Sequence, residues 1–158
     1  MSSVAHLVCF RIGRETYAVD IFVVREIVKA QEITPVPGTA EYVLGIINLR
    51  GKLVSVVDLA QRLGFEKARV DRNSRILVVD LDRFTVGFLV DAATEVLKIP
   101  PEAIEPAPEE LKRSVRDDYL EGVGKLEDRL VIVLNPSNLL SDAEAGSLPG
   151  PAPARAAV

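Results

Sequence analysis

The chain has 158 residues, enough for one domain or for two small domains that share a core. Its formal charge of −4 argues against nucleic-acid binding, which normally selects a concentrated basic surface. One cysteine excludes a disulfide framework, and no apolar run approaches the ~18 residues that cross a bilayer. Because the N-terminus lacks the basic segment of a secretion signal, a soluble cytoplasmic protein without membrane insertion is expected.

Short runs rich in β-branched residues dominate the chain and predict strands. These runs cover residues 7–12, 16–21, 53–57, 76–81, 85–90 and 129–134. Helical content is slight. Asp20 and Asp58 are placed to cap short helical turns, and Asn135 begins another. The connector 100–111, rich in proline and glutamate, predicts an ordered loop with a helical turn.

The C-terminal residues differ in composition from the rest of the chain. From Ser141 onward, small residues and prolines occur without apolar periodicity, which predicts disorder. A single folded domain should therefore span residues 6–140, with 141–158 as a tail. Removal of the chain beyond residue 142 is predicted to leave folding and partner binding intact.

The chain also resembles itself. Residues 6–29 align with 75–98 at a constant offset of 69, and residues 45–59 align with 122–136 at an offset of 77. Order and register agree in both blocks, which indicates an internal duplication. Many short strands in two copies predict an all-β fold of two similar barrels side by side.

The duplication separates residues that the fold needs from residues that act in one copy. Positions alike in both copies are interpreted as packing, and Leu53 and Val133, on central strand patterns, are predicted to be buried. A position at which the two copies carry very different residues indicates a function that only one copy performs. Arg50 stands where the second copy has Glu127, so Arg50 is a candidate functional residue.

The sequence offers little catalytic or metal-binding chemistry. His6 has no serine or cysteine context that completes a triad, and Cys9 lies in an apolar run. Asp80 and Asp82 could share a face for a hard cation, although solvated charges at a strand end are the simpler interpretation. The segment 122–125, GVGK, lacks the spacing of a phosphate loop. A non-enzymatic protein without metal or cofactor, which binds other proteins, is therefore expected.

Residues 45–64, GIINLRGKLVSVVDLAQRLG, resemble the hallmark run of the CheW family of bacterial chemotaxis adaptors, G-x-x-N-L-R-G-x-x-x-P/S-V-V-D-L. Residues 17–27, 86–99 and 119–135 resemble its other motifs in the same order, so the resemblance covers about residues 6–140. It implies two SH3-like five-stranded β-barrels around a shared hydrophobic centre. It also implies an adaptor without enzymatic activity.

The resemblance further implies partners. Members of this family couple the CheA-type histidine kinase, whose regulatory domain is itself CheW-like, to the cytoplasmic tips of methyl-accepting chemoreceptors. Association with itself or with other CheW-like domains in rings is a further implication, as is recruitment to membrane-associated receptor arrays. Two alternatives remain open: a stand-alone β-barrel that binds a ligand or peptide, and a homologue that fills arrays structurally without coupling kinase activity.

The family motifs also mark candidate residues for the receptor or kinase interface. The candidates are Arg50, Glu26, Val24, Gly45, Gly87 and Val96. Arg50 and Glu26 carry opposite charges in the two segments of the first half that most resemble the family, and are predicted to pair on an exposed face. The two glycines are also explained by backbone conformation or close approach, and Val96 by packing in the core.

Overall fold

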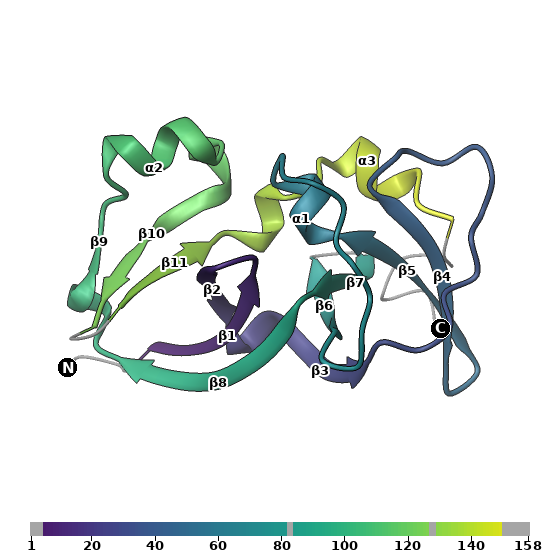
Figure 1. Cartoon of the computed structure of the whole chain (residues 1–158), viewed down its shortest axis with the longest axis horizontal. Coiled ribbons are helices and arrows are strands. Elements are labelled where there is room, and N and C mark those ends of the chain that lie inside the picture. Colours follow the sequence, from purple (N-terminus) through teal and green to yellow (C-terminus); the bar gives the residue numbers. More distant parts are fainter. Residues whose placement is uncertain (1–4, 82–83, 127–128, 150–158) are drawn as a thin grey trace.

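The structure is a computed structural model that describes residues 5–81, 84–126 and 129–149. Within these residues two β-sheets lie side by side, in the strand orders β8-β1-β2-β11-β10-β9 and β3-β6-β7-β5-β4 (Figure 1). The strands are β1 (Ala5–Ile12), β2 (Glu15–Asp20), β3 (Val24–Lys29), β4 (Val43–Leu49), β5 (Lys52–Asp58), β6 (Arg75–Leu81), β7 (Phe84–Val90), β8 (Ala92–Ile99), β9 (Ile104–Glu105), β10 (Leu120–Lys125) and β11 (Leu130–Leu134). The predicted all-β fold of two barrels is confirmed.

Helices are short and connect the strands. They are α1 (Leu59–Arg62), α2 (Glu109–Ser114) and α3 (Asp142–Gly146), with 3₁₀ turns at Ile21–Val23, Pro101–Ala103, Asp117–Tyr119 and Pro136–Asn138. The side chains of Asp20, Asp58 and Asn135 accept hydrogen bonds from backbone N–H groups in the turns they precede, as predicted. No helix in the described residues is long and apolar enough to cross a membrane.

The two sheets confirm the duplication and show that its halves exchange strands. Each sheet combines a hairpin from one half, β1–β2 or β6–β7, with three strands of the other half. These are β8, β10 and β11 in the first sheet, which β9 extends by a short sixth strand, and β3, β4 and β5 in the second. The parallel pairs have equivalent registers: Tyr17 lies opposite Ile132 in one sheet, and Val86 lies opposite Ser55 in the other. β-Bulges also recur at equivalent places in β4 and β10. Because each sheet contains strands from both halves, neither half forms a barrel alone.

Among the residues that the structure describes, the buried apolar side chains form three clusters. One fills the interior of the first sheet around Cys9 and Val133, and one fills the second around Ile47 and Val56. The largest lies between the sheets and draws on both, with Phe10, Tyr17 and Phe88 among its members. This is the predicted shared hydrophobic centre.

The burial of the two predicted core residues differs. Val133 is 2% exposed, as expected, but Leu53 is 44% exposed and the prediction for it is wrong. Leu53 lies opposite Asn48, one pair from the turn of the β4–β5 hairpin. The strand extends beyond the buried core at this end, so the apolar strand pattern does not imply burial. Its counterpart in the second half, Leu130, is likewise 37% exposed.

Residues 141–149 contradict the prediction of a disordered tail. Ser141 and Glu144 form a reciprocal capping box at the start of α3, and Ala145 and Leu148 pack on the central cluster. Residues 150–158 lie outside the described residues. Removal of the chain beyond residue 142 would take these contacts away, so a lower free energy of unfolding is now expected instead of an unchanged one.

Arg62 joins α3 to the rest of the protein. Its side chain is only 13% exposed, donates from Nε to the Leu139 carbonyl at 2.6 Å, and forms an ion pair with Glu144 at 2.7 Å. The guanidinium also lies over the rings of Tyr42, 4.7 Å from the centroid, and Tyr119, 5.8 Å from the centroid. These contacts tie α1, which follows β5, to segments of the second half.

The Arg62–Glu144 contact predicts a pH-dependent contribution to stability. Burial raises the pKa of Glu144, but the backbone N–H of Ser141 and the Arg62 guanidinium outweigh it and hold that pKa below 4.5. The contribution is therefore present above the pKa of the unfolded chain and is lost as pH falls through the folded one. Glu144→Gln should lower the free energy of unfolding by about 1 kcal/mol at neutral pH, and by much less at an acid pH at which the carboxyl is protonated in both folded and unfolded chains. Urea denaturation at both pH values tests this; an equal loss at both would contradict it.

Candidate partner-binding surface

The β4–β5 hairpin presents Arg50 at its tip. Arg50 and Gly51 have φ values of +52° and +87°, so both central residues of the turn adopt left-handed backbone, as in the tight hairpin turns that favour Asn-Gly. Asn48 accepts a hydrogen bond from the Gly51 N–H at 2.8 Å, which holds the turn. Left-handed backbone costs an arginine about 1 kcal/mol of conformational free energy. The backbone conformation of the turn is therefore no reason for an arginine at position 50.

Arg50 pairs with Glu26, as predicted. The guanidinium Nη2 donates to Glu26 Oε2; the arginine side chain is 70% exposed and the carboxylate 24%. Because β3 and β4 are the two edge strands of their sheet, this ion pair connects opposite edges where the sheet closes into a barrel. The hydrogen bond from Arg50 holds the pKa of Glu26 below its usual range, and Glu26 raises that of Arg50. The pair is charged at neutral pH and open to a partner on the arginine side.

The strand that carries Glu26 presents an apolar residue beside it. Ile27 is 40% exposed, and Val24 is half-buried against the central cluster. Between them Arg25 donates from Nε to Asp80 at 3.2 Å, and Asp80 also accepts from the Thr85 hydroxyl. Asp80 therefore serves an ion pair; Asp82, its proposed companion for a cation, lies outside the described residues.

Both candidate glycines are buried and sit where a side chain would collide. A Cβ on Gly45, whose φ is +144°, would lie 2.0 Å from the carbonyl oxygen of Thr34. A Cβ on Gly87 would lie 2.7 Å from the side chain of Ile76. These contacts give each glycine a structural reason to be there, and any effect on a partner would pass through the backbone.

Val96 lies in the other sheet, on edge strand β8, and is 51% exposed. The interpretation of Val96 as a core residue, together with its counterpart Ile27, is therefore wrong, because both face solvent. Beside Val96, Glu95 forms an ion pair with Arg129, which lies at the start of the β10–β11 pairing. Glu95 is the counterpart of Glu26 in the duplication.

The second half thus contains an arginine–glutamate pair like Arg50–Glu26. A position-by-position alignment of the two halves does not reveal it. Glu127, the direct counterpart of Arg50, lies outside the described residues, and the partner of Glu95 is supplied two positions later by Arg129. The two pairs differ in exposure, since the Arg129 side chain is 35% exposed and that of Arg50 is 70% exposed. An alignment that allowed the hairpin arginine to shift by two residues would have found the second pair.

A model of the CheW-like domain family matches residues 6–144 of the chain. The chemotaxis protein CheW of Helicobacter pylori is 37% identical over 137 residues, which make up 87% of this chain and 82% of that protein. The chain belongs to the CheW-like domain family. The probable chemotaxis protein CheW of Rhizobium etli is 34% identical over 139 residues, 88% of this chain and 89% of that protein.

A solved structure shares both fold and sequence with the chain. The crystal structure of the scaffolding protein TtCheW from Thermoanaerobacter tengcongensis matches with a TM-score of 0.80 and 36% sequence identity, over 90% of this chain and 91% of that one. The sequence-based expectation of a CheW-like chain is confirmed. Family membership and these relatives identify a chemotaxis adaptor or scaffold protein.

Proposed function

We propose that this chain couples methyl-accepting chemoreceptors to a CheA-type histidine kinase in the cytoplasm, without catalysing a reaction itself. The observation that supports this most is the Arg50–Glu26 pair. Its arginine lies within the family's hallmark run, at the tip of a hairpin that holds arginine in an unfavoured backbone conformation and exposes it, and Glu26 comes from the separate 17–27 motif. A residue retained against local preference on an exposed tip serves recognition better than folding.

The six candidate residues form the proposed interface to different degrees. Arg50, Glu26 and Val24 belong to one end of the second sheet, with Ile27 as an addition from the structure. Val96 belongs to the first sheet, on its edge strand β8. Gly45 and Gly87 support the backbone beneath.

The alternative of a ligand-binding barrel receives no support from the barrel interiors. The side chains around Cys9 and Val133 fill one, and those around Ile47 and Val56 fill the other. The alternative of an array-filling homologue differs in activity and not in structure. It is an outcome of the kinase assay described in the Discussion.

Binding to the kinase should be direct. Calorimetric titration of the chain with the regulatory domain of the kinase from the same organism is expected to give a Kd on the order of 1 μM, about −8 kcal/mol. Val24→Glu, which places a charge beside the pair on β3, should weaken it at least tenfold. Lys67→Glu, an exposed charge reversal on another loop, is the control and should bind normally. No heat of binding to any kinase of that organism would contradict the proposal.

A further inference from the structure

Arg62 lies where the open ends of two equivalent hairpins meet. In the β4–β5 hairpin, Tyr42 precedes β4 and Arg62 follows β5, in α1. In the β10–β11 hairpin, Tyr119 precedes β10 and Leu139 comes after β11. Tyr42 aligns with Tyr119, and Arg62 with Leu139, at the offset of 77 that relates these two blocks. The Arg62 side chain contacts the other three residues, so it spans both open ends.

The two open ends are otherwise built alike. The Tyr42 carbonyl accepts a hydrogen bond from the Asp58 N–H at 2.8 Å, and the Tyr119 carbonyl accepts one from the Asn135 N–H at 2.8 Å. Asp58 and Asn135 are counterparts at the same offset. At the place of Arg62, however, the second half has a leucine, which is buried. The architecture that the two ends share therefore does not require an arginine here.

The surroundings of Arg62 are costly for a cation and give it a fixed direction. Its side chain is 13% exposed, and desolvation offsets much of the attraction within a buried ion pair, so apolar replacements are often equally stable. The guanidinium is held by the Leu139 carbonyl at 2.6 Å and by Glu144 at 2.7 Å. Apolar packing has no such direction. Arg62 therefore contributes more to the relative orientation of the hairpins than to stability.

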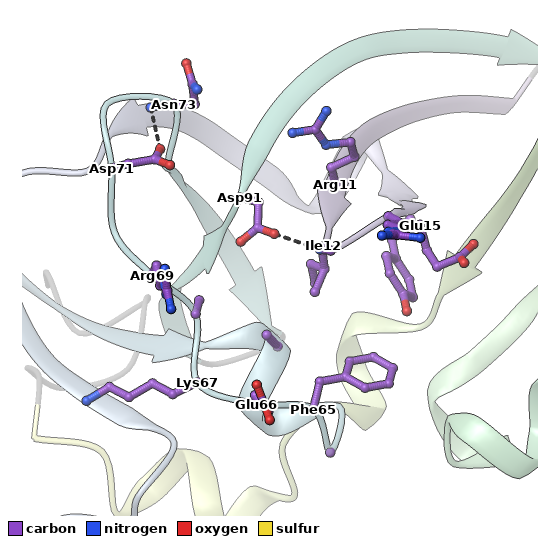
Figure 2. Close-up of a pocket in the computed structure, with 16 residues that line it drawn as sticks. Arg11, Ile12, Glu15, Phe65, Glu66, Lys67, Arg69, Asp71, Asn73 and Asp91 are labelled. Atoms are coloured by element: carbon purple, nitrogen blue, oxygen red, sulfur yellow. Dashed lines mark hydrogen bonds between the residues drawn. The ribbon is translucent and has the colours of Figure 1, made fainter.

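Packing between the two sheets is incomplete beside α1. A hollow of about 730 Å³ opens between the β1–β2 turn of the first sheet and residues 64–73, which follow α1 (Figure 2). At its edge the Gly13 N–H donates to Asp91, in the bend between β7 and β8, at 2.7 Å (Figure 2). Loosely packed apolar contacts lose a unique arrangement before they lose stability. Directional contacts on α1 are therefore well placed to fix the angle between the sheets.

We propose that Arg62 is a positioning residue, which clamps the open ends of the two hairpins and so holds the Arg50 tip of β4–β5 in a fixed place relative to the tip of β10–β11. The strands β4 and β5 pair from the end beside the clamp to the Arg50 turn, so a change of angle at the clamp moves the tip. The inference rests on the proposed coupling function, in which a partner bound at Arg50 is held at a defined angle to the first sheet.

Spin labels on Lys52→Cys and Lys125→Cys, two exposed positions near the two tips, measure the distance between the hairpins in the full chain. Cys9 takes up no label, because it is buried and burial raises its pKa to about 11. Pulsed electron paramagnetic resonance should give one narrow distance distribution when Arg62 is present. Arg62→Leu, which copies the residue of the second half, should fold and give a distribution about twofold broader, because the orientation is no longer unique.

Arg116→Leu is the matched control. Arg116 also lies over the Tyr119 ring, 4.9 Å from its centroid, but its ion pair is with Asp118, two residues away, and stays within one turn. This variant should leave the distribution narrow. Where Arg62→Leu does not fold, Tyr42→Leu removes the β4–β5 side of the clamp and should broaden the distribution in the same way.

A broad distribution in the wild type, an unchanged one in the clamp variant, or equal broadening by Arg116→Leu would overturn the clamp. Arg62→Leu should also keep its Kd for the kinase regulatory domain, since Arg50 and Glu26 are left in place, and lose most of the receptor-coupled activation. Full activation by a chain with a broadened distribution would overturn the role in coupling. The distances are measured without kinase or receptor, so failure of the clamp and failure of the proposed coupling function are distinguishable.

Discussion

Arg50→Glu should abolish receptor-coupled kinase activation while the protein stays folded. The Arg50 side chain is 70% exposed, so the thermal midpoint should shift by no more than a few degrees. The new carboxylate would face Glu26 and repel it, which removes both the guanidinium and the orientation of the pair. Phosphorylation of the kinase in the presence of receptor, measured with wild-type and variant chains, provides the result.

The second half offers a matched control. Arg129→Glu breaks the equivalent pair with Glu95 and changes the net charge by the same amount. It should retain most of the activation, because the exposed arginine of the family motif is left in place. Equal losses from both variants would show that the Arg50 surface has no special role, and normal activation by Arg50→Glu would remove it as a functional site.

A double-mutant cycle tests whether Glu26 and Arg50 act together. The structure places their side chains in direct contact. Neighbouring residues give non-additive effects, whereas distant sites add. The charge swap Glu26→Arg with Arg50→Glu should therefore recover part of the kinase binding that each single change removes. Strict additivity of the two binding free energies would contradict a functional pair.

Phe88→Ala should destabilise the whole protein in one step. Phe88 is 2% exposed in the central cluster between the sheets, and removing a buried aromatic ring typically costs about 3–5 kcal/mol. Because each sheet contains strands from both halves, wild type and variant should each unfold in a single transition, observed by calorimetry. Leu53→Ala, at a 44% exposed position, should cost no more than about 1 kcal/mol. Two separated transitions in the wild type would contradict the shared centre.

The duplication and most strands could be predicted because they depend on local patterns. The runs of β-branched residues and the caps at Asp20, Asp58 and Asn135 act within a few residues of the chain. The exchange of strands between halves could not be predicted, because β3 pairs with β6 through contacts far apart in sequence. An internal repeat shows which segments are alike, but it does not show which strands are neighbours in a sheet.

Two sequence-based predictions were wrong for physical reasons: the disorder of the C-terminal tail and the burial of Ile27. The capping box of Ser141 and Glu144 was present in the sequence, but the prolines and small residues after it hid a helix held by Arg62 from elsewhere in the chain. Ile27 faces solvent because β3 alternates strictly, and its half-buried positions are taken by Val24, Glu26 and Val28. The Arg50–Glu26 pair was predicted from charge and motif alone, whereas the Arg129–Glu95 pair depends on tertiary structure.

Reconstitution tests the proposed coupling of receptor to kinase most directly. Purified kinase, receptor-containing membranes and the chain would be mixed, and kinase phosphorylation measured with each component omitted in turn. Coupling predicts strong activation only when all three are present, and its suppression by receptor ligand. Binding of the chain to the kinase with no change in phosphorylation, with or without receptor, would contradict coupling and identify a structural component of the array.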